Sequence, residues 1–110
     1  NAFGTKLNIP LLPGASDDEL LLALEEIKNF AWEIKVDFII LQAGVDGLSG
    51  DPITHLNYSV EGYGKFVKEI IDLSNMVCNG KLLILGGGGY NPENTKRGWI
   101  KIIEILEKED

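Results

Sequence analysis

The sequence is almost without cysteine, since one residue of 110, Cys78, carries a thiol. No internal disulfide can form, so a reducing compartment is the natural expectation and we predict a cytoplasmic protein. Histidine is equally scarce, with His55 as its single example. Because nothing in the sequence gives His55 a reason to pair with Cys78, we interpret the thiol as buried or idle and not as a nucleophile.

Long apolar runs and an excess of positive charge are also missing. No apolar stretch approaches the roughly 18 to 20 residues that span a bilayer, so no membrane association is expected. The net charge of −7 argues against unaided binding to nucleic acid, because phosphate neutralisation needs clustered Lys and Arg. The same charge fits a cationic partner or substrate, or serves only solubility. The start shows no signal-peptide pattern, and we interpret Asn1 and Ala2 as the remnant of a tag.

The composition that remains is that of an ordinary soluble domain, with 45% hydrophobic and 25% charged residues. A chain of this length is one small domain or a piece of a larger one. Short apolar strands, glycine-bearing loops and amphipathic helices alternate along it. The first strand is predicted at Lys6–Pro10. Its helix begins after Ser16, which forms an S-x-x-E capping box with Glu19.

Two further strand–loop–helix units follow. Val36–Gln42 is a continuous apolar run, which suits a parallel strand covered on both faces, and Lys81–Leu85 is the third strand. Ser59 and Asn91 are placed to cap the helices that come after them. The order β-α-β-α-β-α implies parallel pairing with right-handed crossovers. We therefore predict an α/β fold, a three-layer parallel sheet with helices on both faces, and expect ligands at the edge where the loops leave the strands.

Asp46 stands in the loop just past the second predicted strand. A carboxylate in that position is held by a rigid base and points into the cleft, which suits a hard ligand for a metal ion. Asp46 can equally accept backbone N–H bonds in a tight turn, as aspartate commonly does beside glycine. Spacing alone leaves both interpretations open. Asp51, which precedes Pro52, is interpreted as a structural turn residue.

Consecutive glycines, Gly86–Gly89, precede Tyr90 and allow the backbone to approach a ligand closely. One interpretation is a phosphate cradle at the start of the next helix. The match is poor, because no G-x-x-x-x-G-K-[ST] is present and Asn91 stands where the last glycine of G-x-G-x-x-G belongs. Another interpretation is the lining of a narrow tunnel, with the Tyr90 hydroxyl donating to a reacting oxygen. A packed Tyr90 without a chemical role is the third.

Taken together, these loops carry a resemblance to a known family. The segments are L-Q-A-G-V-D-G-L-S-G-D-P, then L-N-Y-S-V-E-G-Y, then L-G-G-G-G-Y-N-P-E-N-T-K-R-G-W. In this order they resemble the C-terminal portion of class I-like histone deacetylases and of their bacterial and archaeal relatives, including acetoin-utilization proteins. The resemblance covers nearly all of the chain from Leu7. It implies that residues 3–110 are the C-terminal part of a deacetylase domain, with the arginase/deacetylase-type fold.

The resemblance also implies roles for single residues. Asp46 corresponds to the second aspartate ligand of the catalytic zinc, and Tyr90 to the tyrosine that stabilises the tetrahedral oxyanion. Gly87 and Gly88 correspond to the lining of the acyl-lysine channel. The family's N-x-x-R-x-W motif is also matched, and we favour a packing role for its residues, which are Asn94, Arg97 and Trp99. The implied reaction is zinc-dependent hydrolysis of an N-acetyl amide, either acetyl-lysine or an acetylated small amine.

Part of the family's catalytic set has no counterpart among the 110 residues. The family takes an aspartate and a histidine ligand from an earlier loop, and a pair of histidines for acid–base work. His55 matches none of them and is interpreted as a loop residue. Because a catalytic zinc site normally uses three protein ligands, we expect the chain to be inactive alone. We also expect self-association through an uncovered sheet edge.

Two other functional classes stay open at this point. One is a stand-alone α/β binding module that holds an anionic ligand in the Gly86–Gly89 loop. The other is a degenerate deacetylase-like domain used only for protein contacts. Retention of both Asp46 and Tyr90 argues mildly against the second, since neither residue would be needed without catalysis.

Overall fold

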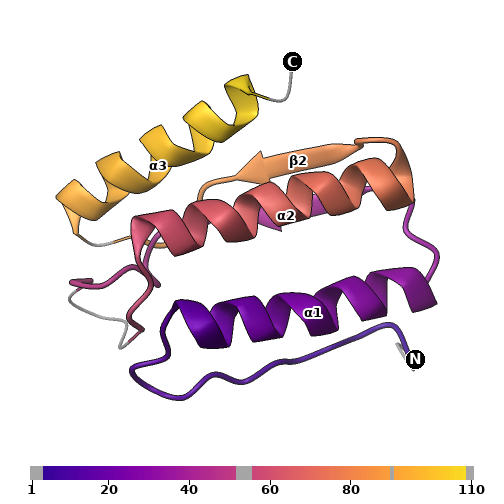
Figure 1. Cartoon of the computed structure of the whole chain (residues 1–110), viewed down its shortest axis with the longest axis horizontal. Coiled ribbons are helices and arrows are strands. Elements are labelled where there is room, and N and C mark those ends of the chain that lie inside the picture. Colours follow the sequence, from indigo (N-terminus) through magenta and orange to yellow (C-terminus); the bar gives the residue numbers. More distant parts are fainter. Residues whose placement is uncertain (1–3, 52–55, 90, 109–110) are drawn as a thin grey trace.

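The computed structural model describes residues 4–51, 56–89 and 91–108, which are built on a parallel pair of strands (Figure 1). Its helices and strands are α1 (Asp17–Glu33), β1 (Ile39–Gln42), α2 (Val60–Cys78), β2 (Leu82–Leu85) and α3 (Pro92–Glu107). The α/β class and the parallel pairing predicted from the sequence are confirmed. None of the helices in the described residues is long and apolar enough to cross a membrane.

The predicted first strand, Lys6–Pro10, is wrong, because this segment has no regular secondary structure. A strand needs a neighbour that satisfies its backbone groups, and in the part of the chain that the structure describes the sheet consists of β1 and β2. Pro10 also lacks the N–H that such a ladder would use. The predicted order β-α-β-α-β-α is therefore corrected to α-β-α-β-α. The second predicted strand is also shorter, since β1 begins at Ile39 and not at Val36.

The predicted helix starts are confirmed, although their caps differ. The Ser59 hydroxyl accepts the N–H of Gly62 at 2.9 Å, and the Asn91 side chain accepts two backbone N–H groups of the first turn of α3. Ser16 is the N-cap residue of α1, but its hydroxyl donates to the Glu19 carboxylate at 3.2 Å and accepts no backbone N–H. The predicted capping box is thus reduced to a contact between side chains.

The helices lie side by side, with α2 between α1 and α3 (Figure 1). One face of the sheet packs into the apolar clusters that the helices form, through Ile39, Leu41, Leu82 and Ile84. The opposite face is open to solvent, with exposed fractions of 65% at Ile40, 45% at Leu83 and 46% at Leu85. The sequence predicted three layers, a sheet with helices on both faces. The described residues form two of them, the sheet and the helices on one of its faces. Apolar side chains on both faces are nevertheless typical of strands that are covered on both faces.

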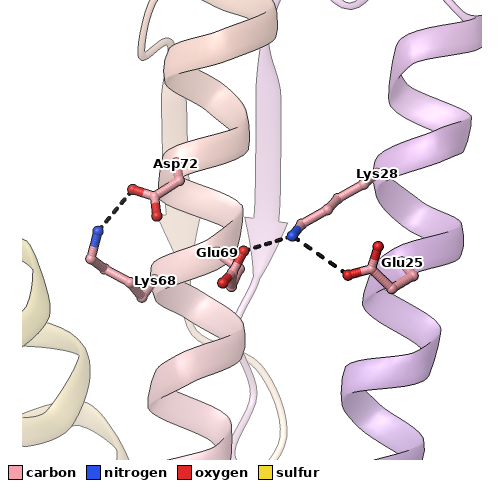
Figure 2. Close-up of polar contacts among 5 residues, drawn as sticks. All are labelled: Glu25, Lys28, Lys68, Glu69 and Asp72. Atoms are coloured by element: carbon pink, nitrogen blue, oxygen red, sulfur yellow. Dashed lines mark hydrogen bonds and ion pairs between the residues drawn. The ribbon is translucent and has the colours of Figure 1, made fainter.

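Polar contacts also join α1 to α2. The Lys28 ammonium of α1 lies 2.7 Å from the Glu69 carboxylate of α2 and 3.8 Å from Glu25 (Figure 2). The hydrogen bond to Glu69 raises the pKa of Lys28. On α2 itself, Lys68 and Asp72 pair at 2.8 Å (Figure 2). All of these groups are partly exposed, so the pairs add little to stability and the apolar clusters hold the helices together.

Candidate active site

Two loops leave the carboxyl ends of the paired strands side by side. The Asp46 loop, residues 43–51, follows β1, and the glycine loop, residues 86–89, follows β2. Because the strands pair in parallel register, both loops emerge at the same edge of the sheet. Beyond the strands they stay joined, since the Val45 N–H donates to the Gly88 carbonyl at 2.9 Å. This edge is the position at which open α/β sheets bind ligands.

The Asp46 carboxylate lies against the backbone of Gly88. A Cβ at Gly88 would lie 2.5 Å from Asp46 Oδ2, and a Cβ at Gly44 would lie 2.7 Å from the Gly88 nitrogen. A Cβ at Gly87 would similarly lie 2.8 Å from Nε2 of Gln42. A Cβ at any of these three glycines would force a neighbouring atom to move, so the close approach of the two loops depends on glycine in both. The structure thus places Asp46 beside the glycines that the sequence singled out.

The residues on either side of Asp46 anchor its loop in the core. Val45 and Leu48 are each 1% exposed, whereas Asp46 is half-buried at the edge. Helix α3 approaches this anchor closely at Gly98, where a Cβ would lie 2.5 Å from Val45 Cγ1. The carboxylate is therefore carried on a backbone with little freedom to move, which is what a metal ligand or a catalytic group needs.

Tyr63 of α2 contacts the Asp46 loop two residues before Asp46. Its hydroxyl donates a hydrogen bond to the Gly44 carbonyl at 3.0 Å. Burial raises the pKa of Tyr63 to about 12, and the negative charge of Asp46 adds to the rise. The hydroxyl therefore stays protonated at neutral pH and remains a donor. The sequence motifs did not indicate this contact. A tyrosine within an apolar stripe was the available signal, because its buried hydroxyl needs a partner.

Asn94 and Asn91 of the α3 start join the far end of the same loop. The Asn94 amide is 2% exposed and donates to the Ser49 carbonyl at 2.8 Å. Its oxygen accepts a hydrogen bond from Arg97 Nη2 at 2.8 Å. Asn91 donates to the Gly50 carbonyl at 3.0 Å. The packing role predicted for the N-x-x-R-x-W residues is therefore, for Asn94, a hydrogen-bonding role toward the Asp46 loop.

The remaining sequence candidates divide into those with a described place and those without. Trp99 packs beside the glycine loop, because a Cβ at Gly86 would lie 3.4 Å from its ring. Tyr90 and His55 lie outside the described residues, so the role assigned to Tyr90 stays a prediction.

The position of Asp46 bears on the anion-binding interpretation of the glycine loop. A phosphate group cradled by this loop would sit beside the Asp46 carboxylate, which lies against Gly88. Like charges at such short range repel one another. A cation, in contrast, would be attracted to the same place.

The residues present fit a zinc ion only in part. Asp46 offers a carboxylate oxygen, which is an accepted zinc ligand. A catalytic zinc site normally has three protein ligands, and among residues 4–51, 56–89 and 91–108 no group of three His, Cys, Asp or Glu side chains is close enough to hold an ion. The described residues can therefore contribute one ligand and do not form a zinc site by themselves.

Comparison with known proteins gives one consistent result. Residues 1–106 match the histone deacetylase domain family. The chain is 34% identical over 93 residues to a probable deacetylase of Archaeoglobus fulgidus, and these cover 84% of this chain and 26% of the relative. It is 33% identical to histone deacetylase 8 of Xenopus laevis, covering 91% of this chain and 30% of that one. It is also 33% identical to the acetoin utilization protein AcuC of Bacillus subtilis, covering 91% and 26%.

Solved structures agree on the fold. The crystal structure of the HDA15 HD domain superimposes with a TM-score of 0.80 at 27% identity, over 94% of this chain and 29% of that one. The chain thus spans 26% to 30% of the length of these relatives.

Proposed function

Because the chain belongs to the histone deacetylase family, we propose that it forms the part of a zinc-dependent deacetylase that carries Asp46 as one of the metal ligands. The substrate class is an N-acetyl amide, either acetyl-lysine or an acetylated small amine. Tyr90 is the proposed oxyanion donor, and Gly87 and Gly88 are the proposed lining of the acyl channel. With one cysteine and no disulfide, the proposed compartment is the cytoplasm.

One observation carries this proposal, namely the contact between the Asp46 carboxylate and the backbone of Gly88. The resemblance gives these two residues adjacent tasks, metal binding and channel lining, although 42 positions separate them along the chain (88 − 46). An active site needs both tasks at one place. Their proximity at the edge where parallel sheets bind ligands supports the proposal.

The chemistry divides between the metal and the residues of this chain. A zinc ion, when bound, polarises the acetyl carbonyl and lowers the pKa of a bound water. Asp46 supplies one carboxylate oxygen toward that ion. The glycine loop offers no side chains, which leaves room for an extended acyl group. A hydrogen-bond donor in the position proposed for Tyr90 typically raises the rate by a factor of about 10²–10³. Alone, the chain is proposed to be inactive, because one ligand does not hold zinc.

A chimera tests the proposal. The segment of the Archaeoglobus fulgidus deacetylase that matches this chain is replaced by it, so that the rest of the site comes from the relative. Hydrolysis of an acetyl-lysine peptide and of an acetylated diamine is then measured together with bound zinc. We expect the chimera to bind zinc and hydrolyse at least one of the two substrates, and Asp46→Ala to abolish both properties.

Asp37 provides the matched control for this experiment. It is an exposed aspartate at the opposite end of β1, so Asp37→Ala removes the same charge without touching the site. We expect Asp37→Ala to retain zinc and activity. A chimera in which Asp46→Ala keeps its zinc and its turnover would refute the assignment of Asp46 as a ligand.

A further inference from the structure

We propose that Tyr63 and Asn94 are positioning residues, which grip the Asp46 loop on either side of Asp46 and so fix the direction of its carboxylate. By a grip we mean a side-chain hydrogen bond to a backbone carbonyl of the loop. This inference rests on the proposed function, since the metal-binding role of Asp46 is itself a proposal. It concerns the shape of the loop before any metal arrives, and it assigns a role to Tyr63 that neither its sequence pattern nor its helix predicts.

The first grip is at Gly44, two residues before Asp46. The Tyr63 side chain is 8% exposed, and its hydroxyl donates to the Gly44 carbonyl at 3.0 Å. Gly44 also lies against the glycine loop, because a Cβ there would lie 2.7 Å from the Gly88 nitrogen. The peptide group between Gly44 and Val45 is therefore held at both ends, by the Tyr63 hydroxyl at its carbonyl and by the Gly88 carbonyl at its N–H.

The second grip is at Ser49, three residues after Asp46. The Asn94 amide donates to the Ser49 carbonyl at 2.8 Å and is itself oriented by Arg97, which donates to the Asn94 oxygen at 2.8 Å. This pair fixes which end of the amide faces the loop. Because Asn94 is 2% exposed, water does not compete for the bond.

The two grips come from different helices, and that arrangement favours positioning over simple packing. Tyr63 belongs to α2 and Asn94 to α3, whereas the loop between the grips follows β1. Backbone hydrogen bonds also hold this span to its neighbours, from the Val45 N–H to the Gly88 carbonyl at 2.9 Å and between Tyr58 and the loop at 2.9 and 3.0 Å. Tyr63 and Asn94 add side-chain donors at the two ends of the span, and both donors are held by helices outside the loop, as second-layer groups hold metal ligands in other proteins.

The test uses nuclear magnetic resonance on the metal-free 110-residue chain, so its result does not depend on whether zinc binds. Tyr63→Phe removes the hydroxyl and keeps the ring. We expect the Gly44 carbonyl carbon and the Asp46 carboxyl carbon to shift, and hydrogen exchange of the Val45 amide to accelerate roughly fivefold to tenfold. Exchange of the Leu24 amide in α1 serves as the reference for global unfolding.

Tyr58→Phe is the matched control. Tyr58 is 7% exposed, and its ring, not its hydroxyl, lies against Gly47 of the same loop. We expect no change at Gly44 or Asp46 in this variant. Unchanged Gly44 and Asp46 resonances in Tyr63→Phe would overturn the proposal, and so would equal acceleration of exchange at Val45 and Leu24, because that result means general destabilisation.

A second variant tests the other grip. Asn94→Asp keeps the size of the side chain and its contact with Arg97, but a carboxylate cannot donate to the Ser49 carbonyl. We expect the Ser49 carbonyl and Asp46 carboxyl carbons to shift, whereas Asn75→Asp at an exposed position of α2 leaves both in place. If Asn94→Asp leaves the Asp46 resonance unmoved, the second grip does not position the carboxylate. If these variants shift the Asp46 resonance as expected but the chimera neither binds zinc nor hydrolyses a substrate, the result counts against the proposed function alone.

Discussion

Replacement of Gly88 by alanine is the sharpest test of the contact between the two loops. The added Cβ would lie 2.5 Å from Asp46 Oδ2 and 2.7 Å from Asp46 Cγ. Real Cβ atoms do not approach other atoms so closely, so either the carboxylate or the glycine loop must move. The φ angle of Gly88 is not among the positive values, so the backbone itself accepts alanine.

The size of the effect follows from what has to move. Overpacking typically costs about 1–3 kcal/mol, and the fixed backbone of Gly88 leaves the short Asp46 side chain as the group that yields. A side chain that rotates toward solvent relieves most of the clash, which places the expected loss of unfolding free energy at about 1–2 kcal/mol. The effect on zinc binding in the chimera is expected to be larger, because the proposed ligand itself is displaced.

Gly86→Ala is the control within the same loop. Its Cβ would meet the Trp99 ring at 3.4 Å, an ordinary contact, and its φ is not positive either. Alanine at such a site leaves stability unchanged or raises it by about 0.4–1 kcal/mol through the unfolded chain. Urea denaturation followed by circular dichroism measures both variants, and a double-mutant cycle adds Asp46→Ala. If Gly88→Ala destabilises the Asp46→Ala protein as much as the parent, the carboxylate is not what the new Cβ meets, and the inferred geometry is wrong.

Two further predictions concern the rest of the chain. The pKa of Tyr63 is raised from 10.0 to about 12. Because this folded value lies above the unfolded one, the stability of about 2–3 kcal/mol linked to the neutral hydroxyl is present below pH 10 and is lost as the pH rises toward 12. Urea midpoints across this range should fall in the parent and fall less in Tyr63→Phe. On the open sheet face, Leu83→Lys should reduce self-association, measured by sedimentation, without lowering the unfolding free energy. Leu22→Lys, at an exposed position of α1, should leave self-association unchanged. Parent chain that sediments as a monomer would contradict the second prediction.

Much of the fold follows from local chemistry that the sequence displays. Ser59 and Asn91 begin their helices because their side chains accept N–H groups of the first turn, and such caps depend only on nearby residues. Lys6–Pro10 was mispredicted for the opposite reason. Its apolar pattern suits a strand, but a strand also needs a partner, and partnership is not a local property.

The candidate site shows the same division. That Asp46 and Gly88 meet could be predicted, because parallel strands bring their following loops to one edge. The hydroxyl of Tyr63 and the amide of Asn94 could not be assigned to the loop, since each bonds a backbone carbonyl, and backbone carbonyls carry no sequence signature. The bond from Asn94 to Ser49 spans 45 positions. Only the docking of α3 against α2 and the Asp46 loop determines which carbonyl the amide meets.

The contacts that shape the Asp46 loop lie within the chain, whereas a complete active site needs groups from outside the described residues. The glycine loop, Tyr63 and Asn94 all belong to the described residues, so every contact found to shape the Asp46 loop is internal to the chain. The remaining ligands that a zinc ion needs are not present in the described residues. The described residues can therefore fix the position of Asp46 although they lack the other ligands of a zinc site. If Asp46 is a ligand, as proposed, a chain that presents it already in place would lose less conformational freedom when the other ligands join it, which is the advantage of a preorganised site.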